Sequence, residues 1–140
     1  MILLDTSILS RAFRRGRPGP EEHRLRSALD RLMAGDEALG LPGIVLQEVL
    51  SGIRSQKQFA DLQRRLVLGF AIVLPMTADY VQAAALRNTC LEKGLNVSGP
   101  DCLIATLAIT GNHRLLTADD DFRRIATHSK LRVLGLDELA

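Results

Sequence analysis

The chain has 140 residues, of which 46% are apolar and only 4% aromatic, with no tryptophan. This length and apolar content suit one compact domain over residues 1–140 and exclude a disordered chain. Eighteen basic residues face sixteen acidic ones, and an isoelectric point near 8.8 favours an anionic partner. The sequence shows no signal-peptide pattern, no apolar run of about 18 residues and no disulfide framework, so we expect a cytoplasmic protein without a membrane segment.

Short apolar runs alternate with stretches of helical periodicity along the chain. Ile2–Leu4 predicts a strand, and Asp5-Thr6-Ser7 after it is typical of a helix start. Further strands are predicted at residues 38–41, 70–74, 114–117 and 131–134. Helices are predicted to about Phe13, at 21–34, from Pro42 to near Gly52, at 56–68, from a Thr77 cap to Lys93, at 98–109 and at 119–126, with a loop at 14–20.

This alternation predicts an α/β fold in which a parallel sheet is covered by helices on both faces. The predicted strands are short and almost wholly apolar, as a sheet buried on both faces requires. In such sheets ligands bind at the carboxyl edge, where strands give way to helices. This edge is therefore the place to look for functional side chains.

Four acidic residues fall at positions that such a fold brings to the carboxyl edge. Asp5 directly follows the first strand, and Asp119 follows the strand at 114–117. Asp101 lies in the first turn of its helix, and Glu48 lies on the helix after the second strand. Together they predict an oxygen-only pocket, which is the kind of site that magnesium and manganese prefer.

Each acid has a structural alternative when it is taken alone. Asp5 or Asp119 could simply cap a helix, and Asp101 could simply complement a helix dipole. Glu48 has apolar neighbours such as Leu46, and a buried acid is costly without a partner, although a solvated stripe could hold it. Only the joint placement of all four acids favours chemistry.

The residues around these acids resemble the PIN-domain ribonucleases, and specifically the VapC toxins of bacterial toxin–antitoxin pairs. The resemblance covers nearly all of the 140 residues. Its motifs are Asp5-Thr6-Ser7, Glu48 with Leu50-Ser51-Gly52, Asp101-Cys102-Leu103-Ile104-Ala105, and Leu116-Thr117-Ala118-Asp119-Asp120-Asp121-Phe122. Each motif is short, but their order, spacing and total length are together fairly specific.

The resemblance implies a three-layer α/β/α sandwich and cleavage of RNA, at a tRNA, rRNA or mRNA site, with Mg²⁺ or Mn²⁺. Carried over residue by residue, it assigns the catalytic and metal-binding acids: Asp5, Glu48, Asp101 and Asp119. Asp119 fits the Thr-x-Asp spacing, while Asp121 is its rival and would otherwise orient the helix start. Relatives form homodimers and pair with a small VapB-type antitoxin that blocks the acidic pocket.

A carboxylate-bound metal would supply the activated water and the charge neutralisation that phosphodiester hydrolysis needs. We expect Asp5 and Asp101 to be ligands, Glu48 to complete the site or orient the water, and Asp119 to hold a second ion or water. The hydroxyls of two threonines could support ligands or waters, with helix capping as an equal alternative. These threonines are Thr6 and Thr117.

Basic residues near the acids could form a track for RNA phosphates, because Lys and Arg neutralise phosphate charge. Arg11, Arg14, Arg15 and Arg17 follow Asp5 closely. Others follow Glu48 and Asp119 in the chain: Arg54, Lys57, Arg123 and Arg124. A solvated surface is the alternative for all of them.

Two other functions compete with the nuclease hypothesis. One is a catalytically inactive module, binding nucleic acid or protein, in which the acids serve only as caps; the presence of all four acids argues against it. The other is a haloacid-dehalogenase-like phosphatase, which needs a second Asp two residues after the first, where this chain has Ser7.

Overall fold

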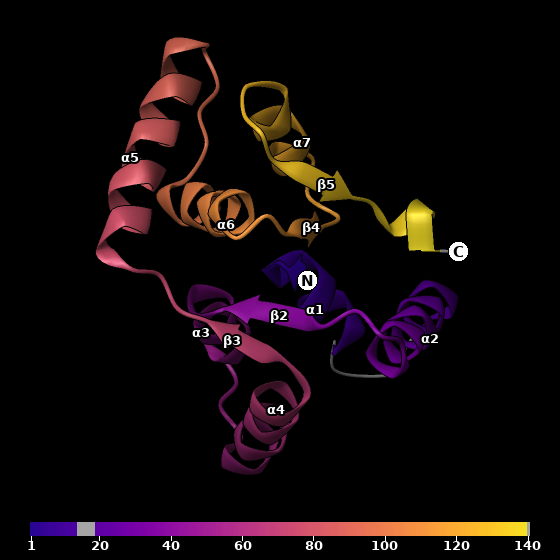
Figure 1. The fold of residues 1–140 in the computed structure, drawn as a ribbon. Coiled ribbons are helices and arrows are strands. Elements are labelled where there is room, and N and C mark those ends of the chain that lie inside the picture. The colour runs from indigo at the N-terminus through magenta and orange to yellow at the C-terminus, as the bar shows by residue number, and fades with distance from the viewer. Residues whose placement is uncertain (14–18, 140) are drawn as a thin grey trace.

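The computed structural model describes residues 1–13 and 19–139, and five parallel strands form its centre (Figure 1). The strands are β1 (Ile2–Leu4), β2 (Leu39–Pro42), β3 (Ala71–Val73), β4 (Arg114–Leu116) and β5 (Arg132–Leu134). Their order in the sheet is β3-β2-β1-β4-β5. The order reverses at β1, so the carboxyl ends of β1 and β4 flank the switch point where such sheets bind ligands.

Helices fill every connection between the strands. They are α1 (Thr6–Ala12), α2 (Pro20–Ala34), α3 (Gly43–Leu50), α4 (Gln56–Gly69), α5 (Thr77–Glu92), α6 (Gly99–Thr110) and α7 (Asp120–Thr127), followed by a 3-10 helix, η1 (Leu136–Leu139). α1 packs on α2 and α3, whereas α5 and α7 pack on α6, and Figure 1 separates α2–α4 from α5–α7. Right-handed crossovers on either side of β1 put these two groups on opposite faces, which confirms the predicted α/β/α layers.

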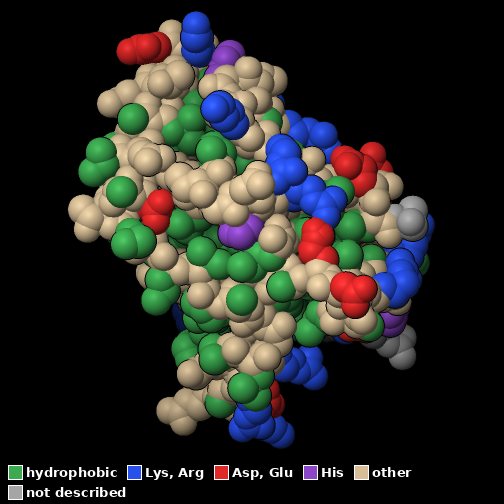
Figure 2. All heavy atoms as spheres, viewed as in Figure 1, with side chains coloured by type: hydrophobic (Ala, Val, Ile, Leu, Met, Phe, Trp, Pro, Cys, Tyr) green, Lys and Arg blue, Asp and Glu red, His purple; other side chains and the backbone are tan. Residues whose placement is uncertain are grey.

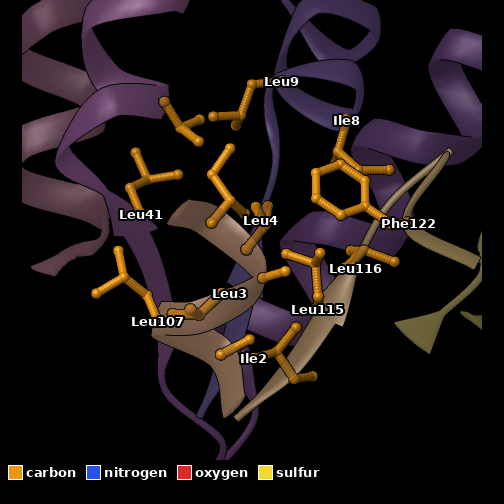
Figure 3. Close-up of a cluster of buried hydrophobic side chains, with 14 of the residues drawn as sticks. Ile2, Leu3, Leu4, Ile8, Leu9, Leu41, Leu107, Leu115, Leu116 and Phe122 are labelled. Carbon is orange, nitrogen blue, oxygen red and sulfur yellow. The ribbon is translucent and has the colours of Figure 1, made fainter. Parts of the chain in front are cut away.

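The core forms around β1, whose residues Ile2, Leu3 and Leu4 are almost fully buried. β1 pairs with β2 on one side and with β4 on the other, so its short apolar run has no edge exposed to water. Figure 3 shows Ile8 of α1 and Phe122 of α7 in the same apolar cluster. Apolar burial near the carboxyl edge therefore anchors the two helices that start beside Asp5 and Asp119.

Several local predictions were wrong. The run at 70–74 was expected to be a buried strand, but β3 is an edge strand and Ala71 is exposed. The predicted Thr77 cap is wrong, because the cap residue is Met76, whose backbone N–H donates to Asp79 Oδ2 at 2.8 Å. α3 ends at Leu50 rather than near Gly52, which has φ of 88°, a left-handed conformation that favours glycine.

Other boundaries shifted by a residue or two, as element ends commonly do. The loop predicted at 14–20 falls mostly outside the described residues, and α2 begins at Pro20, inside it. η1 was not predicted. Among residues 1–13 and 19–139, no helix has both the length and the apolar character needed to cross a membrane.

Candidate metal centre

Asp5 lies directly after β1 and is only 3% exposed. Ser7 Oγ donates to Asp5 Oδ1 at 2.7 Å, and the backbone N–H of Ile8 donates to the same oxygen at 3.4 Å. Burial raises the pKa of Asp5 above 3.8, hydrogen bonds lower it, and the charge of Asp119 raises it. Asp5 thus caps α1, and its buried carboxylate is held in place by hydrogen-bond donors.

Thr117 joins the ends of β1 and β4. Its Oγ1 donates to Asp5 Oδ2 at 2.7 Å and accepts the backbone N–H of Asp119 at 3.0 Å. Ser7 reinforces the same junction, since its Oγ accepts the backbone N–H of Ala118 at 3.0 Å. Of the two roles predicted for Thr117, the structure shows the support of an acid. Ser7, to which the sequence analysis gave no role in the site, contributes equally to this network.

Asp101 comes to the site from the other helical layer, in the first turn of α6. Ser98 caps that helix, because its Oγ accepts the backbone N–H of Asp101 at 3.1 Å. Burial raises the pKa of Asp101 to about 6; Ser98 opposes this, while the charges of Asp119, Asp121 and Asp5 add to it. The carboxyl of Asp101 therefore faces three others across the edge of the sheet.

Asp119 and Asp121 share the fourth corner of the site. One oxygen from each of Asp101, Asp119 and Asp121 lies within 4.8 Å of the other two. Asp119 is the residue that caps α7, because its Oδ1 accepts the backbone N–H of Asp121 at 2.9 Å, and Asp121 lies in the first turn of that helix. The carboxylate of Asp121 instead accepts from Arg124 Nη1 at 2.7 Å.

Glu48 lies on α3 and has an exposed side chain. Partial burial raises its pKa first, repulsion by Asp5 raises it further, and Thr6 lowers it. Thr6 Oγ1 is nonetheless a buried atom without a hydrogen-bond partner among the described residues. Thr6 therefore lies near the Glu48 carboxylate without a hydrogen bond of good geometry, and its hydroxyl is left unsatisfied.

The residues present fit a divalent cation. The site offers carboxylate oxygens alone, the donors that Mg²⁺ and Mn²⁺ prefer. Burial is the main cause of the raised pKa values of Asp5, Glu48 and Asp101, and repulsion between neighbouring acids adds to it; a bound cation would relieve that repulsion. The unpartnered Thr6 hydroxyl is a further group that a metal-bound water would satisfy.

The predicted basic track is only partly seen. Arg11 is exposed in the last turn of α1 and lines a hollow with α2 and the C-terminal segment; the four predicted acids do not line this hollow. Arg14, Arg15 and Arg17 lie outside the described residues. Arg124 is the basic residue that the structure places in direct contact with the acidic cluster.

The fold and site define an α/β protein with a parallel sheet and a group of acids at the switch point, the edge at which such sheets bind ligands. The sequence model of the PIN domain family matches residues 2–127. The chain belongs to the PIN domain family, which confirms the family predicted from the sequence. It is 28% identical over 145 aligned residues to Ribonuclease VapC31 from Mycobacterium tuberculosis (strain CDC 1551 / Oshkosh), covering 94% of this chain and 98% of that protein.

Solved structures share the fold at lower identity. VapBC2 from Rickettsia felis, bound to a DNA fragment from its promoter, aligns with a TM-score of 0.77 and 22% identity over 98% of this chain and 100% of that one. VapC20 from Mycobacterium tuberculosis, described as a sarcin-ricin loop cleaving toxin, aligns with a TM-score of 0.71 and 14% identity over 94% and 99%. At these identities the likeness is one of fold.

Proposed function

We propose that this chain is a divalent-metal-dependent endoribonuclease and the toxin of a toxin–antitoxin pair. The observation that carries the proposal is the gathering of acids from β1, α6 and the β4–α7 junction at one edge of the sheet. The 28% identity to a protein named as a ribonuclease, over nearly the whole chain, supports RNA as the substrate.

The proposal gives each acid a role. Asp5 and Asp101 would bind Mg²⁺ or Mn²⁺, Glu48 would orient the attacking water, and Asp119 would hold a second ion or water. The metal would supply an activated water and neutralise the charge that develops on the phosphate. Because Asp119 Oδ1 accepts a hydrogen bond at the start of α7, the other carboxylate oxygen of Asp119 would face the metal.

The chain's own hydroxyls would hold these ligands in place. Thr117 and Ser7 fix both oxygens of Asp5, so that carboxylate would meet the metal without first having to reorient. Thr6 would hydrogen-bond a water between Asp5 and Glu48. Because Asp5 is buried, little water would screen the attraction between its carboxylate and a bound cation.

The proposal also includes protein partners: a small VapB-type antitoxin and a second copy of the chain, in the cytoplasm. Two apolar runs, at residues 46–53 and 59–68, are candidates for such contacts. In 59–68 the structure exposes Phe59, Val67 and Leu68, whereas Leu50 in the other run is buried. A second apolar surface follows β3 and is formed by Leu74, Met76, Tyr80 and Val81. Figure 2 shows apolar side chains gathered on the α5 side of the molecule.

The test is cleavage of total RNA and transfer RNA with Mn²⁺, by the wild-type protein and by Asp5→Ala prepared in the same way. We expect cleavage by the wild type alone, and its loss when a chelator is added. Equal cleavage by both proteins would point to a contaminating nuclease and contradict the proposal. Absence of cleavage with tight RNA binding would favour the inactive interaction module instead.

A further inference from the structure

Arg124 places a cation of the protein's own against the acidic cluster. Its Nη1 lies 2.7 Å from Asp121 Oδ1, and the two side chains are 58% and 40% exposed. Asp121 is also one of the three acids whose oxygens approach one another within 4.8 Å. One carboxylate therefore serves both the cluster and an arginine, and the arginine is reachable from solvent.

The ordinary explanation is a surface ion pair between residues three apart on α7. Such pairs contribute little net stability, because water screens them and ordering the long side chains costs entropy. A weak and exposed pair is also one that a stronger ligand replaces easily. A divalent ion at the cluster competes with the guanidinium for Asp121, and an RNA phosphate competes with Asp121 for the guanidinium.

We propose that Arg124 is a tethered counter-cation of the acidic cluster, which exchanges Asp121 for an RNA phosphate when the cluster is loaded with divalent metal. The proposal rests on the proposed nuclease function. Metal loading and RNA binding then reinforce each other. A metal that binds Asp121 frees Arg124 for a phosphate, and a phosphate that binds Arg124 frees Asp121 for the metal. In the metal-free protein Arg124 stays on Asp121 and contributes little to binding RNA.

The chain supplies a matched control in the next residue. Arg123 carries the same charge on the same helix, but its nearest ion-pair partner is Glu138, at 4.0 Å. Glu138 lies on η1 and is not one of the clustered acids. Arg123→Gln and Arg124→Gln therefore remove equal charge, but only the second removes the contact with the cluster.

The first measurement is Mn²⁺ affinity by calorimetric titration of the RNA-free protein. If Arg124 competes with the metal, Arg124→Gln binds Mn²⁺ about threefold more tightly, and Arg123→Gln stays within about 1.5-fold of wild type. Weaker Mn²⁺ binding by Arg124→Gln would mean that the arginine positions Asp121 as a ligand. That result would overturn the proposal, as would equal changes in the two variants.

The second measurement is a double-mutant cycle in chelator, with a fluorescein-labelled single-stranded RNA of mixed sequence at low salt. Asp121→Asn frees the guanidinium without any metal. We expect Arg124→Gln to weaken RNA binding less than twofold in the wild-type background but about fivefold in the Asp121→Asn background. Arg123→Gln should have the same effect in both backgrounds.

Two failures are distinguishable. An equal effect of Arg124→Gln in both backgrounds would overturn the exchange while leaving the nuclease proposal untouched. RNA binding by none of these proteins, even with metal, would contradict the proposed function itself. The Mn²⁺ titration does not involve RNA, so it tests the counter-cation role in either case.

Discussion

The hydroxyl of Thr117 donates to Asp5 Oδ2 at 2.7 Å, joining two residues 112 positions apart in the chain. The bond links the carboxyl ends of the neighbouring strands β1 and β4, where the sheet order reverses. Since the same hydroxyl accepts the backbone N–H of Asp119, one side chain sets the spacing of two predicted acids. The geometry of the site thus depends on a buried neutral group as much as on the acids.

Thr117→Val should separate the hydrogen bonds of the Thr117 hydroxyl from the packing of its side chain, because valine keeps the shape of threonine and lacks the hydroxyl. Asp5 loses a donor and the Asp119 N–H loses an acceptor, so we expect a loss of about 1–3 kcal/mol in the free energy of unfolding. RNA cleavage should fall about 10- to 100-fold, as for other groups that support ligands. Urea unfolding and initial cleavage rates measure both effects. Thr117→Ser should restore most of each, and failure of serine to do so would contradict the hydrogen-bond explanation.

Asp101→Asn should abolish cleavage and leave the metal-free fold as stable as the wild type or more so. The reason is that Asp101 faces the charges of Asp119, Asp121 and Asp5, and asparagine removes that repulsion while keeping the volume. Denaturant unfolding of both proteins in chelator measures it. A large destabilisation would show that Asp101 is chiefly structural.

The contribution of Asp101 to the stability of the metal-free protein should fall as pH rises from about 4 to about 6. Asp101 has its pKa raised to about 6 by burial and nearby charges, against 3.8 for an ordinary aspartate. In that range the unfolded chain releases a proton that the folded chain retains, so raising the pH favours unfolding. Asp5 and Glu48, whose pKa values are also raised, act in the same direction.

The measurement is the difference in unfolding free energy between wild type and Asp101→Asn, in chelator, across this pH range. We expect the Asp101 contribution to be on the order of 1–2 kcal/mol, after allowance for its partial exposure. It should be lost as pH rises to about 6 and change little above that. A difference that stays constant from pH 4 to 7 would contradict the raised pKa.

Much of the fold could be predicted from the sequence because apolar runs and helix starts are local signals. The strand Ile2–Leu4 and the helix start near Ser98 were visible in short segments, and the parallel sheet followed from the alternation of strands and helices. The position of β3 at the edge was not visible, because an apolar run does not say which strands lie beside it. The Met76 cap was missed because threonine, the next residue, is a commoner cap than methionine. The hydrogen bond from the Met76 backbone N–H to Asp79 fixes Met76 as the cap residue.

The sequence also predicted one part of the candidate site and left another part open. Sequence placed Asp5, Asp101 and Asp119 at one edge, and the structure brings their charges within reach of one another. The Thr-x-Asp spacing favoured Asp119 over Asp121, but it could not show that the Asp119 carboxylate caps α7, because that depends on a contact seen only in the structure. The metal-binding roles of these acids remain predictions.

Phe122→Ala should test how far the core positions the site. Phe122 is 1% exposed and anchors the first turn of α7, which begins at Asp120, so its removal leaves a cavity under that helix. We expect a loss of about 3–5 kcal/mol in unfolding free energy and a marked loss of Mn²⁺ affinity. Leu68→Ala is the control, because Leu68 is 79% exposed and should change stability by less than about 0.5 kcal/mol. Equal thermal unfolding curves for the two variants would contradict this anchoring role.

The most direct test of the central claim is calorimetric Mn²⁺ titration of the wild type and of single variants of the acids. The variants are Asp5→Asn, Glu48→Gln, Asp101→Asn and Asp119→Asn, with Asp61→Asn, an exposed acid on α4, as the control. If the acids share one metal site, each of the four variants weakens Mn²⁺ binding at least about tenfold, and Asp61→Asn binds as the wild type does. Mn²⁺ binding that is unchanged in all four variants, or absent from the wild type, would contradict the account.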